Sequence, residues 1–417
     1  MTSESDPEGP WGPRKADLKP PPPTESAPQT KPATSADPAP SREEVTPVIF
    51  HGSRRDWVGI MARGMALYLP TFGFYRFWLK TEQRRFLWRS ISVNDEALAY
   101  HGTARELLVG FLFAIAVYLP ISVTYFILGL YAETVQAFAS VPFALFTIVF
   151  SYFAAYRARR YRLTRTVFRG VRFWMDGSAW RFAFTALGWM VATGVTLGIA
   201  WPWMAAGLER FKWRHSHFGD LQGDFHGTGW GLFKALFWPA LGLVVGAFIP
   251  IANLLAIPIM MSAIIAVYGH WLIGGVSFGP VRFQSSIDSF LLLGPAVVTA
   301  LAVGLFGAVW IGIGYVGFWG SLLGLASFEV PQGSDAAVLG ALVRHAPWLL
   351  LGFAWGLIGL VGITFLKSLF FDFPRMQRFA ASTSLTNAEA LETVVQKGHA
   401  EGSLGEGLAD ALGSDGF

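Results

Sequence analysis

The 417-residue sequence contains no cysteine and few charged residues. The absence of cysteine excludes disulfides, iron–sulfur clusters, cysteine-based zinc sites and cysteine nucleophiles. Charged residues make up only 14% of the chain, whereas soluble domains carry about 25%. Hydrophobic residues make up 53%, and the 46 glycines are usual where helices pack closely in lipid. The composition therefore predicts a membrane protein.

Several catalytic motifs are also absent from the sequence. It has no P-loop, no glycine fingerprint for dinucleotides and no Gly-x-Ser-x-Gly elbow. None of its apolar segments contains Asp or Glu, which counts against a transporter coupled to protons or sodium. We therefore predict that the protein is not an enzyme and carries no cofactor.

Charge is distributed unevenly along the chain. Residues 1–46 have a net charge of −3 and residues 380–417 one of −5, so the central residues 47–379 carry +12. The basic residues of the central part lie between apolar runs, so we expect contact with anionic lipid headgroups and none with nucleic acid. Residues 380–417 are predicted to be an acidic cytosolic tail.

The first 46 residues are rich in proline and poor in large apolar side chains. Half of the 24 prolines occur by Pro47. Such a segment cannot offset its ordering entropy by burial, so it is predicted to be a disordered cytosolic leader. Its alternative role is a polyproline docking segment for a cytosolic protein partner.

Eight segments are apolar enough to enter a bilayer: 57–79, 107–131, 138–156, 179–204, 231–250, 254–273, 289–315 and 347–366. About 20 helical residues cross a hydrocarbon core of ~30 Å. Two segments, 57–79 and 179–204, are interrupted by glycine and proline, which break a helix. We expect these two to be re-entrant helices and the other six to span.

The distribution of Lys and Arg supports six spans. With two re-entrant segments and a cytosolic N-terminus, 27 of the 32 basic residues lie on the cytosolic side and 1 lies outside. With eight spans, the basic segments 80–106 and 157–178 would lie outside, against the positive-inside rule. The predicted fold class is thus an all-α polytopic membrane protein with six transmembrane helices, two re-entrant broken helices and short cytosolic β-hairpins.

An internal repeat relates the two interrupted segments. A shift of 125 residues superposes Thr71 and Gly73 on Thr196 and Gly198, and Arg85-Phe86 on Arg210-Phe211. The shared unit is a helix end with an arginine and an aromatic residue, then a hairpin, then the next helix. Repeats are predicted at about 50–174, 175–283 and 284–379. Because an isolated hairpin is marginal in water, we expect the copies to pair with one another.

These motifs resemble a known family. Phe50-His51-Gly52, the Thr71-x-Gly73 break with Trp78 downstream, Arg85-Phe86 and the repeated Asn/Gly turn followed by Arg/Phe resemble the YjgN-like bacterial inner-membrane proteins. The resemblance covers about residues 47–395. It implies the bacterial inner membrane and no known activity, cofactor or catalytic residue. The family's Pro-Trp after the break occurs only in the second copy, as Pro202-Trp203; the first copy has Phe77-Trp78.

One polar cluster is a candidate metal site. In a hairpin that turns near Gly219–Gly223, His217 would face Asp224 and His215 would face His226. Three imidazoles and a carboxylate on one face could bind Zn²⁺ or Ni²⁺. The alternative is a solvated polar face. This cluster would also have to carry any enzymatic activity.

Two further sets of residues are candidate lipid and substrate sites. Guanidinium groups beside aromatic rings suit lipid phosphates at the interface, although generic anchoring explains the same pattern. The arginines of this kind are Arg85, Arg160, Arg210 and Arg378. Broken helices that meet in the membrane hold the binding sites of many transporters. The residues at the two breaks are Thr71, Gly73, Thr196 and Gly198.

The sequence therefore predicts an integral protein of the bacterial inner membrane with both termini in the cytosol. The leading hypothesis is a membrane-embedded binding or transport module for a lipid-like or uncharged solute. The alternative is a non-catalytic scaffold that recruits cytosolic partners through its tails.

Overall fold

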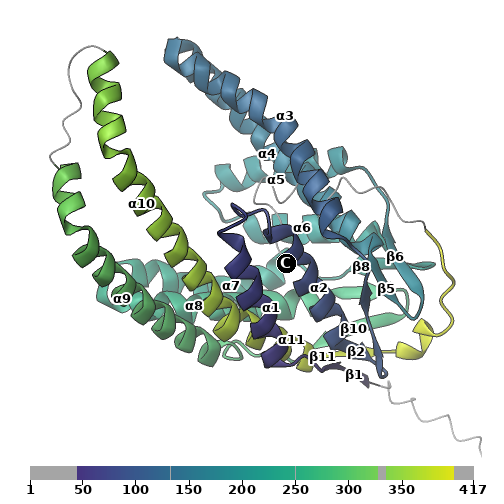
Figure 1. Ribbon diagram of the computed structural model, residues 1–417. Helices are drawn as coiled ribbons and strands as arrows, with labels where there is room; N and C mark the ends of the chain where they lie inside the picture. The colour runs from purple at the N-terminus through teal and green to yellow at the C-terminus, as the bar shows by residue number, and fades with distance from the viewer. Residues whose placement is uncertain (1–44, 132, 249, 327–334, 399–417) are drawn as a thin grey trace, which may run out of the picture. The chain divides into compact units, whose positions relative to one another are not determined.

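The computed structural model describes residues 45–131, 133–248, 250–326 and 335–398 (Figure 1). In these residues, pairs of helices alternate with short strands. The helix pairs are α1 (Arg54–Tyr68) with α2 (Arg76–Ser90), α3 (Ala104–Tyr131) with α4 (Glu133–Thr164), α5 (Ala179–Val195) with α6 (Trp201–Arg214), α7 (Gly229–Ala247) with α8 (Pro250–Gly274), and α9 (Leu293–Ala326) with α10 (Asp335–Lys367). A π-helical turn, η1 (Ser368–Asp372), joins α10 to α11 (Phe373–Ala381).

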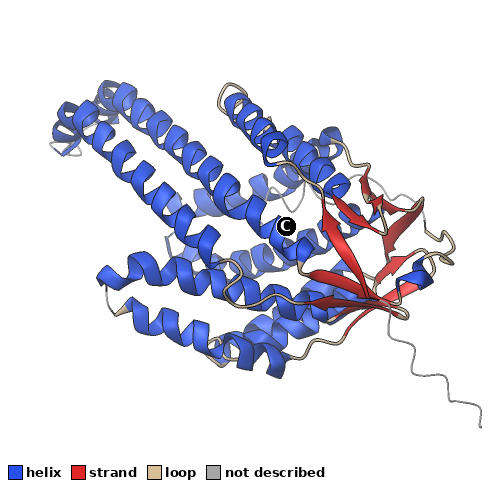
Figure 2. Ribbon diagram, turned by 90° about the horizontal axis from the view of Figure 1, so that it is seen from below, coloured by secondary structure: helices blue, strands red, loops and turns tan. Residues whose placement is uncertain are grey.

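The strands lie between the helix pairs. They are β1 (Val45–Phe50), β2 (Ile91–Val93), β3 (Glu96–Ala97), β4 (Ala99–Tyr100), β5 (Thr166–Phe168), β6 (Val171–Met175), β7 (Ser216–Phe218), β8 (Leu221–Phe225), β9 (Val276–Phe278), β10 (Val281–Ser285) and β11 (Thr383–Thr386). Each helix pair leaves from one strand and returns to another. Figure 2 shows the strands in red, gathered beside one end of the helix pairs.

All these strands form one antiparallel sheet that is nearly a closed ring. Its order is β3-β2-β1-β11-β10-β9-β8-β7-β6-β5-β4. The two ends of this order, β3 and β4, are separated in the chain by Leu98 alone, so one interrupted strand pairs with β2 on one side and β5 on the other. Strands β1 and β11, from opposite ends of the described chain, also pair, with Val45 opposite Thr386.

The predicted all-α fold class is therefore wrong. The helices of the prediction are present, but the hairpins join into a continuous barrel-like sheet of eleven strands in the described part of the chain. The reason is that each hairpin leaves two unpaired edges, and pairing with hairpins from distant parts of the sequence satisfies their backbone N–H and C=O groups. Strand β11 also lies within residues 380–417, for which the sequence suggests a tail.

The interior of the ring is an apolar core built from alternate residues of the strands. The buried members on the strands are Val48, Val93, Phe168, Phe218, Phe225, Val276, Phe278, Val281 and Leu385, and Ala380 and Ala388, from the segments on either side of β11, pack with them. Phe173 packs against Phe218 with ring centroids 4.5 Å apart. Polar residues such as Arg282 and Gln284 alternate with the apolar ones on β10 and are exposed. The strand period of two thus separates a filled interior from a polar outer face.

Tight turns close the hairpins at the end of the ring away from the helices. Asn94 and Asp95 have φ values of 50° and 62°, and Arg169 and Gly170 have 51° and 75°. Positive φ at both central residues is the type I′ geometry, whose twist matches that of the paired strands. The hairpins therefore have fixed registers.

The last described residues cross these turns. After β11 the chain forms the 3₁₀ helix η2 (Ala388–Leu391). The amide of Asn387 donates to the carbonyl of Pro280 at 3.2 Å, and the N–H of Val395 donates to the Asp220 carboxylate at 3.1 Å. The N–H of Arg172 donates to the side-chain oxygen of Gln396 at 2.6 Å. Residues 387–396 therefore tie together the turns of three hairpins.

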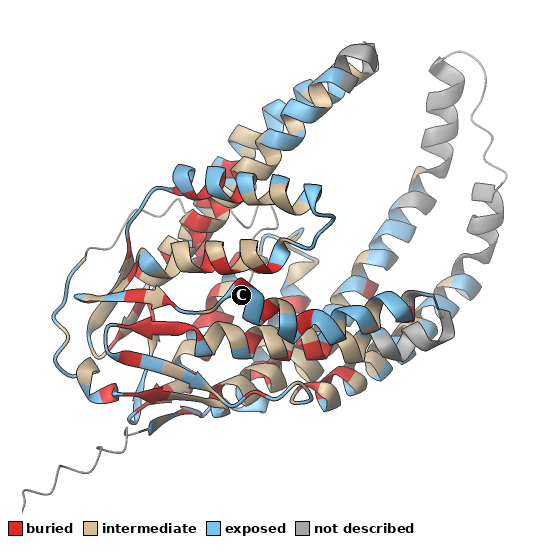
Figure 3. Ribbon diagram, turned by 180° about the vertical axis from the view of Figure 1, so that it is seen from behind, coloured by how far each residue is buried: buried red, intermediate tan, exposed pale blue. Residues whose placement is uncertain are grey.

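Six helices in the described part of the chain are long and apolar enough to cross a membrane. They are Ala104–Gly129, Phe138–Thr164, Gly229–Gly246, Ile257–Gly274, Leu293–Tyr315 and Leu350–Ala381. At most 22% of the most apolar stretch of each is buried in the protein. Figure 3 shows buried residues in red, mainly on the strands and on the helix ends beside them. Exposed apolar helices of this length indicate a multi-pass membrane protein.

The interior of the ring should carry much of the stability. Phe218 is 1% exposed, so Phe218→Ala removes a buried ring and is expected to destabilise the fold by about 3–5 kcal/mol. The measurement is the thermal unfolding midpoint of the detergent-purified protein, followed by tryptophan fluorescence. Phe72→Ala is the matched control, because Phe72 is 93% exposed. Equal midpoints for the two variants would contradict a packed ring.

Candidate functional site

The same junction between helix and sheet recurs around the ring. An arginine near the end of a returning helix donates to a glycine carbonyl 17 residues later, just before the next helix. The pairs are Arg85 with Gly102 at 3.0 Å, Arg160 with Gly177 at 3.4 Å, and Arg210 with Gly227 at 3.2 Å. Each arginine therefore connects its own helix to the start of the following helix pair.

This junction gives the predicted headgroup arginines a structural role. Three of them make the contact just described, and the fourth, Arg378, donates instead to the carbonyl of Leu291. Hydrogen bonds from charged groups contribute about 1.5–3 kcal/mol each. The recurrence of Arg-aromatic pairs is thus explained by bracing between helices. Lipid phosphate binding by the same arginines remains a prediction.

The two predicted substrate motifs form the same turn twice, at the tips of the short helix pairs. The Thr71 hydroxyl donates to Leu67 at 2.6 Å and accepts from the N–H of Tyr75 at 3.0 Å. Thr196 makes the same bonds, to Ala192 at 2.8 Å and from Ala200 at 3.1 Å. The glycines have the positive φ that a turn requires, 81° for Gly73 and 93° for Gly198.

These bonds give all four residues a local role in joining two helices. The residue between each threonine and glycine is apolar and points away from the protein. Phe72 and Leu197 are each 93% exposed. The internal repeat was identified from identical residues. Because Phe72 and Leu197 differ, the repeat did not indicate that both turns carry an exposed apolar side chain.

Each of the four proposed metal ligands makes a separate contact with another residue. The His217 ring stacks on Trp174 with centroids 4.0 Å apart, and His215 Nδ1 lies 2.7 Å from the Phe211 carbonyl. Asp224 accepts from Arg214 at 3.2 Å, and His226 Nε2 lies 3.0 Å from the Ser277 hydroxyl. Within the described residues, no three His, Asp or Glu side chains come close enough to hold a metal.

The expected pairing of His217 with Asp224 is also wrong. His217 lies opposite Gln222, because the turn comprises only Gly219 and Asp220 and ends earlier than predicted. Burial lowers the pKa of His217. Burial alone would raise the pKa of Asp224, but hydrogen bonds from the Phe225 N–H and from Arg214 outweigh it, and the pKa is lower than usual. The neutral form of the His217 imidazole and the ionised form of the Asp224 carboxylate are thus favoured.

A buried ionic cluster lies between three helices beside the ring. Glu209 of α6 is only 6% exposed, and its Oε1 atom lies 2.5 Å from the Lys212 ammonium. Arg159 of α4 and Tyr268 of α8 interact with the same carboxylate. The Arg159 guanidinium also lies 4.4 Å from the centroid of the Trp213 ring. Burial lowers the pKa of Lys212, while Glu209 opposes this shift.

This cluster has polar atoms left over. Glu209 Oε2, Trp213 Nε1 and Arg159 Nε are buried and have no hydrogen-bond partner in the described part of the chain. Burying unsatisfied polar groups costs about 1–3 kcal/mol each, so such groups point to a function or to an unseen ligand. Sequence reasoning missed this cluster because its members come from three separate helices. The one available signal was Glu209, an acidic residue on an otherwise apolar and basic helix.

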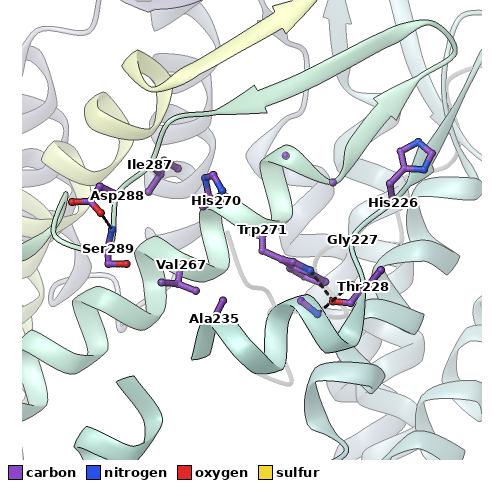
Figure 4. A pocket seen from close by; sticks show the side chains of 13 residues that line it. His226, Gly227, Thr228, Ala235, Val267, His270, Trp271, Ile287, Asp288 and Ser289 are labelled. Carbon is purple, nitrogen blue, oxygen red and sulfur yellow. Dashed lines mark hydrogen bonds between the residues drawn. The ribbon is translucent and has the colours of Figure 1, made fainter. Parts of the chain in front are cut away.

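Another junction differs from those with arginine. His270 occupies the arginine position, 17 residues before Ile287, and a recess of about 570 Å³ opens there. The recess is lined by residues from the start of α7, the end of α8 and the segment after β10 (Figure 4).

The bracing role of arginine predicts a loss of stability in Arg210→Gln. The guanidinium donates to Phe225 at 3.4 Å and Gly227 at 3.2 Å, and glutamine is too short to reach both carbonyls. We expect a destabilisation of about 1–3 kcal/mol. The measurement is the unfolding midpoint in detergent, with Arg282→Gln, an exposed arginine on β10, as control. Equal midpoints for both variants in detergent, with a difference only in anionic lipid, would instead assign Arg210 to headgroups.

Comparison with known proteins gives one match. The model of a family described as "Bacterial protein of unknown function (DUF898)" matches residues 45–411. No curated protein and no solved structure matches the chain. The match covers most of the sequence and agrees with the YjgN-like resemblance. The chain therefore belongs to the DUF898 family of bacterial proteins.

Proposed function

We propose that the protein is a membrane-embedded binding or transport module for a lipid-like or uncharged solute in the bacterial inner membrane. The family is bacterial, and six helices are long and apolar enough to span. Both termini are proposed to lie in the cytosol, because that threading keeps 27 of 32 basic residues on the cytosolic side. The sheet, which contains the basic hairpins, is then cytosolic.

The short helix pairs support re-entrant elements. Helices α1 and α5 have 15 and 17 residues, and therefore extend about 22–25 Å, less than the hydrocarbon core of ~30 Å. Each pair returns to the sheet from which it started. The exposed Phe72 and Leu197 at the tips are suited to hydrocarbon. Helix ends that stop inside the membrane are a common feature of transporter binding sites.

The observation that carries the proposal is the buried Glu209 carboxylate. A charged group in an apolar helix bundle is costly, and buried ion pairs often add little stability. One oxygen of Glu209 has no hydrogen-bond partner by geometry among the described residues, although Tyr268 interacts with the carboxylate, and Arg159 and Lys212 make the surroundings cationic. Such a cluster could bind the polar end of an amphiphile whose apolar part lies among the helices.

Topology can be tested directly because the natural sequence contains no cysteine. We expect a cysteine at Gly170, in the turn between β5 and β6, to react with a membrane-impermeant maleimide only after the cytosolic side is opened. A cysteine at Phe72 should react from neither side, because the tip lies in hydrocarbon. Labelling of Gly170→Cys in intact spheroplasts would refute the cytosolic sheet, and labelling of Phe72→Cys from outside would refute a re-entrant tip.

The proposed binding role predicts that a solute accompanies the purified protein. We expect native mass spectrometry and extraction to find a lipid-like molecule or small solute, and Glu209→Gln to reduce its amount by about tenfold, the loss that corresponds to ~1.4 kcal/mol. Glu389→Gln, at an exposed glutamate of η2, is the control. Equal amounts of bound solute in parent and Glu209→Gln would contradict the assignment.

Deletion of residues 1–44 tests the alternative of a scaffold that acts through its tails. Full retention of the bound solute after this deletion would favour the binding module over the scaffold.

A further inference from the structure

The recess at His270 has a mixed polar and aromatic lining. In Figure 4, Asp288 and Ser289 lie on one side, His226 and Thr228 on the other, and His270 and Trp271 between them. The recess has a volume of about 570 Å³ and opens to the outside. Phe290 and Trp230, which are chain neighbours of the lining residues Ser289 and Gly231, are 67% and 53% exposed.

The position of the recess corresponds to that of an arginine side chain elsewhere in the ring. At three other junctions, an arginine donates to a carbonyl 17 residues ahead. The same spacing leads from His270 to Ile287. Histidine is shorter than arginine and has no guanidinium fork. The space that a cationic side chain fills at the other junctions is therefore left open here.

A second difference adds negative charge at the same place. The residue after the glycine is a hydroxyl cap at the other junctions, where Ser178 accepts from the N–H of Arg181 and Thr228 from that of Gly231. At this junction that residue is Asp288. Its carboxylate accepts from the N–H of Ser289 at 2.7 Å, and no cationic side chain pairs with it among the described residues. This junction therefore has a histidine in the arginine position and a carboxylate in the hydroxyl position, and the arginine next to it, Arg378, donates to the carbonyl of Leu291.

The aromatic lining also suits a cation. Trp271 is fixed by a hydrogen bond from its indole N–H to the Thr228 carbonyl at 3.2 Å and by the Phe225 ring, whose centroid is 4.9 Å away. A tryptophan face attracts an ammonium group through its quadrupole. The Ser289 and Thr228 hydroxyl groups and the His270 imidazole offer acceptors for its N–H donors.

We propose that this recess binds a primary ammonium group, with Asp288 as its counter-ion, in the place of the arginine that the other junctions contain. The ammonium belongs either to a lipid headgroup or to a free amine. This assignment does not rest on the Glu209 cluster, which involves other residues and the polar end of a different molecule.

The decisive variant is His270→Arg, which restores the arginine of the other junctions. The full-length protein would be incorporated into nanodiscs that contain phosphatidylethanolamine or, as a matched lipid without N–H donors, phosphatidylcholine. Lipid bound after transfer to detergent would be counted by native mass spectrometry. A second arm would titrate the detergent-solubilised protein with ethanolamine and with spermidine by calorimetry.

We expect the parent to retain phosphatidylethanolamine, or to bind a free amine, about tenfold more strongly than His270→Arg and Asp288→Asn. His270→Arg should keep or raise the unfolding midpoint, so that lost binding cannot be attributed to unfolding. Asp95→Asn, in the turn between β2 and β3, should bind as the parent does. Selectivity for the lipid identifies a headgroup, and binding of ethanolamine or spermidine alone identifies a free amine.

Two results would overturn the assignment. The first is a parent protein that retains both lipids equally and binds neither ethanolamine nor spermidine. The second is undiminished ammonium binding in His270→Arg or Asp288→Asn. Loss of solute in Glu209→Gln with ammonium binding unchanged would leave this site intact, and the converse would leave the Glu209 proposal intact.

Discussion

The pairing of β1 with β11 is the interaction on which the architecture depends. It joins strands that lie at opposite ends of the described chain, with Val45 opposite Thr386 and Pro47 opposite Ser384. Without it, the sheet would be open and two edges with unpaired N–H and C=O groups would remain, a common cause of aggregation. With it, the five helix pairs of the described residues are anchored to one ring. Each helix pair therefore starts and ends at a fixed place.

A rigid ring explains why the junctions can be specialised one at a time. The strand registers position the start of every helix pair, and the arginine contacts at Gly102, Gly177 and Gly227 repeat because the local geometry repeats. A junction that has lost its arginine still has neighbouring strands to hold it. We therefore expect the fold to tolerate substitutions of His270 and Asp288, in the same way that loops on a rigid scaffold carry function in other proteins.

The buried cluster around Glu209 illustrates the same principle in the helices. Glu209, Arg159 and Tyr268 belong to α6, α4 and α8, which return to the ring at β7, β5 and β9. The ring places these three helix ends around a common interior. Charges buried there are stabilising only if their partners are held in place, and the Oε2 atom of Glu209 has no hydrogen-bond partner by geometry among the described residues. A site of this kind is a property of the assembled ring.

The sequence by itself determined the six helices that are long and apolar enough to span a membrane and the interruptions at Thr71–Gly73 and Thr196–Gly198, because hydrophobic length, glycine and threonine act locally along the chain. It also indicated the hairpins through alternation and turn residues. Only the tertiary structure decided that the hairpins form one ring, that the arginines brace neighbouring helices and that His217 lies opposite Gln222. These features depend on hydrogen bonds between residues that are far apart in the sequence, and the pattern of any one segment contains no information about its partner.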